Sequence, residues 1–209
     1  MIYQFLIGSM RNFTYLIEDS GEALVIDPQD NLSPWTEVLH KTHSQLKGIL
    51  LTHSHHDHVR GLKVIPIPVP IFLHTYESFR FKNWPEDILN RFQFIEDNEL
   101  ISCGNLQIKV IHSPGHSPGE LCYLLEENAK TYLFSGDTVF VGDVGRTDLE
   151  GGNTTDLFQT IQKLKQLKPD TIIMPGHHYG QFPTSTIETE IQTSKAFQCK
   201  TVEELDELP

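Results

Sequence analysis

The segment Thr52-His53-Ser54-His55-His56-Asp57-His58 places four histidines and an aspartate within seven consecutive residues. It follows the short apolar run Gly48 to Thr52, which is typical of a buried strand. A helix would spread these side chains around its circumference, so we expect a loop at the carboxyl end of a strand to present them. Imidazole and carboxylate groups suit zinc, iron or manganese, and a set this large can hold two ions. The alternative is a histidine-rich turn that faces solvent.

Three further segments repeat this arrangement later in the chain. Each follows a predicted strand and carries one metal-compatible side chain in a turn: Ser113-Pro114-Gly115-His116 after Leu106 to Ile111, Ser135-Gly136-Asp137 after Thr131 to Phe134, and Met174-Pro175-Gly176-His177 after Thr171 to Met174. Taken singly, each has a structural explanation, such as a capping histidine or a turn aspartate. Four strands that end in this way favour one shared site at a common sheet edge.

The remaining pattern predicts an α/β (α+β) fold with two mixed sheets packed face to face and helices outside. The supporting elements are short strands at Ile2 to Ile7, Asn12 to Glu18, Ala23 to Ile26, Val69 to Leu73 and Leu121 to Leu125, an amphipathic helix that Ser33 caps with Pro34 at its first position, a helix from Thr154 to about Leu167, and a last helix from about Thr186 to Phe197. No linker divides the chain. We therefore expect a single domain over residues 1–209, with an acidic C-terminal tail over about 198–209.

Composition narrows the range of partners. The chain has 16 basic and 28 acidic side chains, a formal net charge of −12, which argues against a nucleic-acid partner. No apolar run reaches the roughly 20 residues of a membrane span, and the first residues do not resemble a signal peptide. Three cysteines without CxxC spacing argue against disulfides and fit a cytoplasmic protein. We expect a small-molecule substrate and no membrane partner; the sequence does not indicate the oligomeric state.

The blocks THxHxDH, PGH, GDT and PGH, in this order, resemble the metallo-β-lactamase fold hydrolase superfamily. The resemblance implies an αββα sandwich and two divalent ions, with zinc expected first and iron or manganese as alternatives. It implies the following ligands: His53, His55 and His116 for one ion, Asp57, His58 and His177 for the other, and Asp137 as a bridge. Asp57 and Asp137 would act as the catalytic carboxylates. His56 and His178 fall on variable positions, and we expect them outside the ligand set.

The segment Phe140 to Leu149 contains Gly-Arg-Thr-Asp and resembles a loop of glyoxalase II-like thioester hydrolases and of persulfide dioxygenases. A short glyoxalase II-like protein is the leading hypothesis, since only about thirty residues follow His177, where full-length glyoxalase II enzymes continue into a helical domain. A metal-bridging hydroxide would then attack a thioester such as a hydroxyacylglutathione, and Arg146 would bind a substrate carboxylate. The loop can also be read as a turn with a structural Arg–Asp pair.

Two other functions remain open at this stage. The first is a persulfide dioxygenase, in which His53, His116 and Asp137 would hold one iron. The second is a metal-stabilised scaffold without catalytic turnover. A serine-hydrolase or P-loop mechanism has no basis, because the sequence contains neither a Gly-x-Ser-x-Gly segment nor a P-loop.

Overall fold

The computed structural model describes residues 1–208 and contains two six-stranded sheets. The first sheet has its strands in chain order: β1 (Ile2–Ile7), β2 (Asn12–Asp19), β3 (Glu22–Ile26), β4 (Gln45–Leu50), β5 (Ile71–Leu73) and β6 (Phe92–Phe94). The second has the order β12 (Ser185–Thr186), β11 (Ile172–Pro175), β10 (Lys130–Gly136), β9 (Leu121–Glu127), β8 (Leu106–His112) and β7 (Leu100–Cys103). Both sheets combine parallel and antiparallel pairs, as predicted.

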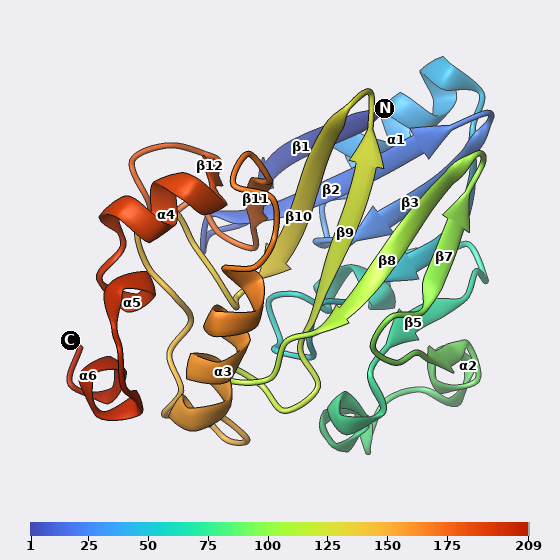
Figure 1. Cartoon of the computed structure of the whole chain (residues 1–209). Helices are drawn as coiled ribbons and strands as arrows, with labels where there is room; N and C mark the ends of the chain where they lie inside the picture. The colour runs from blue at the N-terminus through green and yellow to red at the C-terminus, as the bar shows by residue number, and fades with distance from the viewer. Residues whose placement is uncertain (209) are drawn as a thin grey trace.

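The sheets lie face to face, and helices cover their outer faces (Figure 1). The α-helices are α1 (Ser33–Thr42), α2 (Glu86–Leu89), α3 (Thr154–Leu164), α4 (Ile187–Thr193), α5 (Lys195–Gln198) and α6 (Val202–Asp206), and the 3₁₀ helices are η1 (Arg60–Lys63) and η2 (Thr75–Phe81). None of the helices in the described chain has the length and apolar character that a membrane span requires. The predicted αββα sandwich is confirmed.

Side-chain alternation along the strands explains the four layers. On β2, Tyr15 and Ile17 contribute to the core between the sheets, whereas Leu16 joins the core beneath α1 with Trp35. On β9 of the second sheet, Tyr123 also joins the central core, while its neighbour Cys122 packs with residues of α3 in a third cluster. Successive residues of a strand point to opposite faces, so each sheet supplies one face to the centre and one to its helices.

The C-terminal prediction was wrong in two respects. The predicted helix from Thr186 to Phe197 is interrupted at Ser194, whose extended backbone separates α4 from α5. The predicted acidic tail over 198–209 contains α6 within its described part; the Thr201 hydroxyl caps this helix by accepting a hydrogen bond from the Glu204 N–H. Leu205 is buried against the cluster beneath α3. The acidic residues therefore form the outer face of a packed helix rather than a solvated tail.

The packing of α6 gives a stability prediction. We expect Leu205→Ala to lower the free energy of unfolding by about 2 kcal/mol, because Leu205 is only 6% exposed and its removal leaves a cavity. Leu100→Ala is the control, since that leucine is 62% exposed. Urea unfolding followed by circular dichroism measures both changes. Equal stabilities for the two variants would show that α6 does not contribute to the folded core.

Two boundaries also differ from the sequence prediction. Helix α1 begins at Ser33 with Leu32 at the capping position, so the Ser33 hydroxyl does not cap it, although Pro34 occupies the first turn as expected. Strand β5 begins at Ile71 rather than at residue 69. Proline has no N–H to donate to a ladder, and Pro70 instead accepts a hydrogen bond from Ile49 N–H through its carbonyl. The proline-rich approach therefore shortens the strand.

Candidate metal centre

The seven residues predicted as ligands lie together where β4, β8, β10 and β11 end. They form three overlapping groups: His53, His55 and His116; His53, His58 and Asp137; and Asp57, His58 and His177. Within each group, one candidate ligand atom per residue lies within 4.8 Å of the others. The four loops that the sequence singled out therefore converge on one buried cluster.

What we call the first group, His53, His55 and His116, contains three imidazole rings set edge to face. The ring centres of His53 and His116 lie 5.1 Å apart, and those of His55 and His116 lie 4.6 Å apart. The Nε2 atoms of His53 and His55 are buried and have no hydrogen-bond partner among the described residues. His55 Nδ1 lies 2.9 Å from His116 Nε2. Buried polar atoms are normally paired, so the unpaired His53 Nε2 in the same group fits a bound cation.

What we call the second group, Asp57, His58 and His177, combines two imidazoles and a carboxylate. His58 Nε2 lies 3.1 Å from His177 Nε2, and Asp57 Oδ2 lies 3.2 Å from His177 Nε2. Asp57 Oδ2 also accepts a hydrogen bond from Asn12 Nδ2 at 2.9 Å, which fixes the carboxylate. This set suits a first-row divalent ion as well as the first group does.

Asp137 connects the two groups. Its Oδ1 lies 3.3 Å from His58 Nε2, while its Oδ2 lies 3.4 Å from His177 Nε2 and 3.7 Å from His116 Nε2. The Asp137 N–H donates to Glu120 Oε1 at 2.7 Å, and Gly136 permits the turn through its positive φ of 50°. One carboxylate thus has an oxygen near the imidazoles of both groups.

Acceptors outside the cluster orient the imidazoles. The Nδ1 atoms of His58, His116 and His177 lie 2.9, 2.7 and 2.9 Å from Asp27 Oδ2, the Arg146 carbonyl and the Met10 carbonyl, respectively. A hydrogen bond of this kind places the proton on Nδ1 and leaves the Nε2 lone pair for a metal. The three Nε2 atoms accordingly face the centre of the cluster.

Sequence reasoning missed these supporting residues. Asp27 is buried, and besides His58 it accepts hydrogen bonds from the Thr52 N–H at 2.9 Å and the Thr52 hydroxyl at 2.7 Å. Its position directly after the apolar run Ala23 to Ile26 was a usable signal, because it is a further strand that ends in a carboxylate. Asn12 and Glu120 carried no comparable signal.

Electrostatics divide the cluster into two halves. Burial lowers the pKa of His53 well below its usual range and lowers the pKa of His55 to about 3. Burial also opposes charge on His58 and His177, but neighbouring carboxylates outweigh it: they raise the pKa of His58 well above its usual range and that of His177 to about 9. In the metal-free protein, protonated His58 and His177 therefore supply the positive charge that a bound ion would otherwise provide.

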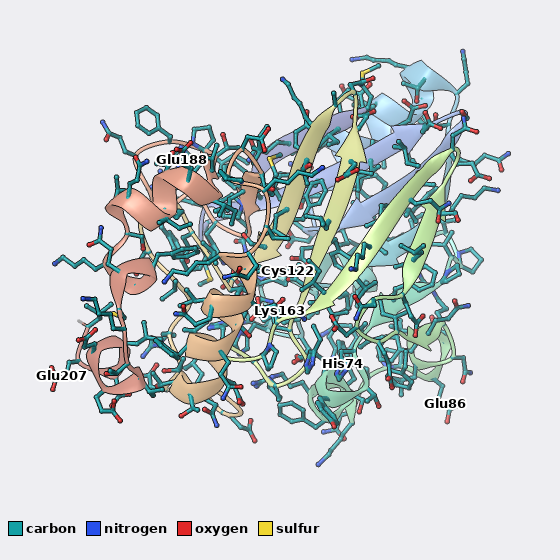
Figure 2. The ribbon with its side chains drawn as sticks, in the orientation of Figure 1. His74, Glu86, Cys122, Lys163, Glu188 and Glu207 are labelled. Carbon is teal, nitrogen blue, oxygen red and sulfur yellow. The ribbon has the colours of Figure 1, made fainter. Side chains whose placement is uncertain are left out.

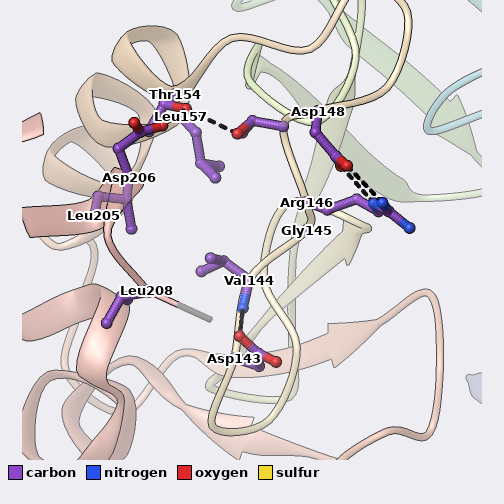
Figure 3. Close-up of a pocket in the computed structure, with 11 residues that line it drawn as sticks. Asp143, Val144, Gly145, Arg146, Asp148, Thr154, Leu157, Leu205, Asp206 and Leu208 are labelled. Atoms are coloured by element: carbon purple, nitrogen blue, oxygen red, sulfur yellow. Dashed lines mark hydrogen bonds and ion pairs between the residues drawn. The ribbon is translucent and has the colours of Figure 1, made fainter. Parts of the chain in front are cut away.

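Arg146, predicted to bind a substrate carboxylate, is paired within its own loop. Its Nη2 donates to Asp148 Oδ2 at 2.6 Å, and its guanidinium is largely exposed (Figure 3). The pair borders a cavity of about 530 Å³ between residues 143–148 and helices α3 and α6. Within the segment that lines the cavity, Gly145 packs closely against the His116 ring, because a Cβ added at Gly145 would lie 2.9 Å from His116 Cγ. This cavity and the histidine cluster therefore share one backbone segment.

The two histidines expected outside the ligand set belong to none of the three groups. The His56 side chain is 71% exposed. The His178 ring stacks on Phe13 at 5.6 Å. Next to it, Tyr179 stacks on the His177 ring at 4.5 Å and remains half exposed, so an aromatic face borders the cluster on its solvent side.

Comparison with known proteins agrees with this arrangement. Residues 8–177 match the family model described as the metallo-beta-lactamase superfamily. The chain belongs to this superfamily. Its relatives include a probable polyketide biosynthesis zinc-dependent hydrolase of Bacillus subtilis, PksB, at 33% identity over 90% of this chain and 82% of the relative. A hydroxyacylglutathione hydrolase of Francisella tularensis subsp. novicida is 32% identical over 84% of this chain, and the matched region covers 66% of that enzyme.

Solved structures show the same fold. A metallo-beta-lactamase of Staphylococcus aureus superposes with a TM-score of 0.87 at 31% identity, covering 100% of this chain and 68% of that one. ETHE1 of Myxococcus xanthus superposes with a TM-score of 0.83 at 23% identity over 100% of this chain and 92% of its own, and at that identity it supports the fold alone. The predicted superfamily is thereby confirmed, and the similarity to a hydroxyacylglutathione hydrolase fits the predicted resemblance to glyoxalase II-like proteins.

Proposed function

We propose that this protein is a binuclear, zinc-dependent thioester hydrolase that acts on a hydroxyacylglutathione or a similar acyl thioester. The observation that carries this proposal is Asp137, which has oxygens near the imidazoles of both histidine groups. Two divalent ions held there would lower the pKa of a shared water and polarise a carbonyl oxygen. The titles of the relatives, a zinc-dependent hydrolase and a hydroxyacylglutathione hydrolase, support hydrolysis and the substrate class.

The residues of the chain would perform the remaining tasks. Asp57 and Asp137 would offset the positive charge of two ions, and both are held in place: Asn12 donates to the Asp57 carboxylate, and Glu120 accepts a hydrogen bond from the Asp137 backbone N–H. The exposed face of Tyr179 offers a surface for the acyl group. A thiolate leaves without a strong general acid, so the cluster needs no further proton donor for this reaction. Arg146 would bind a substrate carboxylate in place of its present partner, the Asp148 carboxylate.

The grouping of the ligands favours this proposal over the persulfide dioxygenase. The triad expected for a single iron, His53, His116 and Asp137, is not among the three close groups, whereas both three-residue halves of a binuclear site are. A second supporting feature is Asp57, which belongs to a close group although the one-iron triad does not use it. Two of the three close sets of ligand atoms therefore support the proposal of two metal positions, and the third, His53, His58 and Asp137, joins them.

Metal analysis combined with turnover tests the proposal. The protein is purified without added metal and assayed for zinc, iron and manganese, then for hydrolysis of S-lactoylglutathione and of an N-acetylcysteamine thioester, and for oxygen uptake on glutathione persulfide. Two zinc ions per chain with thioester hydrolysis are expected. One iron with oxygen uptake would replace the proposal by the dioxygenase, and metal without any turnover would favour a scaffold. Activity on both thioesters would mean that glutathione is not specifically recognised.

Two neighbouring histidines provide a matched pair of variants. We expect His55→Ala to lower the affinity for the first ion by at least about 10- to 100-fold, the loss found even for residues that only support a ligand. His56→Ala should bind both ions nearly normally, because this side chain is 71% exposed and belongs to none of the close groups, although its Nδ1 lies 3.6 Å from Asp57 Oδ1. Competition with a chromophoric chelator measures both affinities. Equal losses in the two variants would contradict the assigned ligand set.

A further inference from the structure

A fully buried glutamate, Glu77, lies between two of the ligand loops. It belongs to η2, which follows β5 and the residue His74 labelled in Figure 2. The Glu77 N–H donates to the His74 carbonyl at 3.0 Å, which fixes the start of its 3₁₀ turn. Glu77 is not among the candidate metal ligands, so its burial needs another explanation.

Its carboxylate bridges the loop of the first sheet and a loop of the second. Oε2 accepts hydrogen bonds from the Ser54 N–H at 2.8 Å and from the Ser54 hydroxyl, and Oε1 accepts one from the Gly119 N–H at 2.8 Å. Ser54 stands between His53 and His55. In an extended segment neighbouring side chains point to opposite sides, so Ser54 turns toward Glu77 while both histidines turn toward the metal cluster.

Gly119 allows the close approach on the other side. A Cβ added there would lie 2.9 Å from Glu77 Cγ and 3.0 Å from its backbone nitrogen, which leaves no room for a side chain. Gly119 lies three residues after His116 and one before Glu120, whose carboxylate accepts the Asp137 N–H. The Glu77 carboxylate therefore joins the His53–His55 loop to the segment after His116, beside the backbone hydrogen bond from the Leu121 N–H to the Thr52 carbonyl at 2.8 Å.

We propose that Glu77 is a positioning residue that builds the first metal position by holding His53 and His55 at a fixed distance from His116. Two of its side-chain hydrogen bonds go to Ser54, between His53 and His55, and the third goes to Gly119, three residues after His116. The second group has supports that do not involve Glu77: Asn12 for Asp57, Asp27 for His58 and the Met10 carbonyl for His177. Of these, Asp27 also contacts Thr52, beside His53. Loss of the Glu77 carboxylate should therefore weaken one metal position selectively. The inference rests on the proposed binuclear centre and not on the choice of substrate.

Glu77→Gln tests this proposal with almost no change in volume. The Ser54 donors face one carboxylate oxygen, and the Gly119 N–H faces the other. A glutamine must direct its NH₂ group at one of these donors, so it loses the hydrogen bonds on that side. We expect the affinity for the first ion to fall by about 10- to 100-fold, the usual effect of losing a residue that supports a ligand, while the second ion binds normally. Chelator competition and the visible spectrum of the cobalt-substituted protein measure this without reference to activity.

Two further variants separate positioning from general stability. Glu190→Gln is the matched control, because Glu190 is also a buried glutamate that accepts a backbone N–H, that of Gly142, at 2.9 Å. It should lower thermal stability without changing the affinity for either ion. Ser54→Ala, which removes a single bond to Glu77, should weaken the first ion in the same direction as Glu77→Gln but by less. Normal affinity for both ions in Glu77→Gln, or equal weakening of both, would overturn the proposal.

Discussion

Asp137→Asn should lower the turnover number for thioester hydrolysis by about 10²- to 10³-fold, the scale of losing an electrostatic contribution at a reacting centre. Asn has nearly the same shape, but it lacks the negative charge and replaces one carboxylate oxygen by an NH₂ group. Both oxygens of Asp137 approach imidazole nitrogens, His58 on one side and His116 and His177 on the other. The substitution would therefore weaken both metal positions at once, which distinguishes it from His55→Ala.

Asp143→Asn is the control for this experiment. Asp143 follows Asp137 by six residues, and its Oδ1 accepts a hydrogen bond from the Val144 N–H rather than facing the histidine cluster. The measurements are metal content by elemental analysis and steady-state kinetics with S-lactoylglutathione. Asp137→Asn that retained two ions and normal turnover would exclude a bridging carboxylate at this position, and with it the basis of the proposed mechanism.

The candidate site was predictable because its residues follow a local rule. Each of the turns at His53, His116, Asp137 and His177 comes directly after a short apolar strand, and such turns gather at one sheet edge. Periodicity predicted the strands, residue type marked the turns after them, and the resemblance to the superfamily supplied the expected ligand set. None of these steps required knowledge of long-range contacts.

The residues that hold the ligands could not be found in this way. Glu77 is separated by 23 residues from Ser54 and by 42 from Gly119, and nothing near it in sequence marks those contacts. The C-terminal error has a similar origin. Residues 202–206 are rich in acidic side chains, and the burial of Leu205 against the α3 layer, together with the Thr201 cap, stabilises a helix there. Tertiary packing decided both features.

The two metal positions should respond differently to pH. The metal-free protein holds a proton on His177 below about pH 9, and the neighbouring carboxylates also keep a proton on His58 well above the usual pKa of histidine. A metal ligand must be a neutral imidazole, so the second ion must displace these protons. In the first group, His55 has a pKa of about 3, and burial holds the pKa of His53 well below its usual range, so both are already neutral near pH 7.

The sign follows from this proton balance. Affinity for the second ion should rise by about tenfold per pH unit for each displaced proton as pH increases toward 9, a gain of at least ~10²-fold between pH 6 and 8. Affinity for the first ion should change much less over that range. His55→Ala isolates the second position and His177→Ala isolates the first. Zinc titration calorimetry in phosphate and in Tris counts the protons released, because these buffers differ in ionisation enthalpy. Equal proton release from both variants would show that Asp57 and Asp137 do not hold the second group in its charged form.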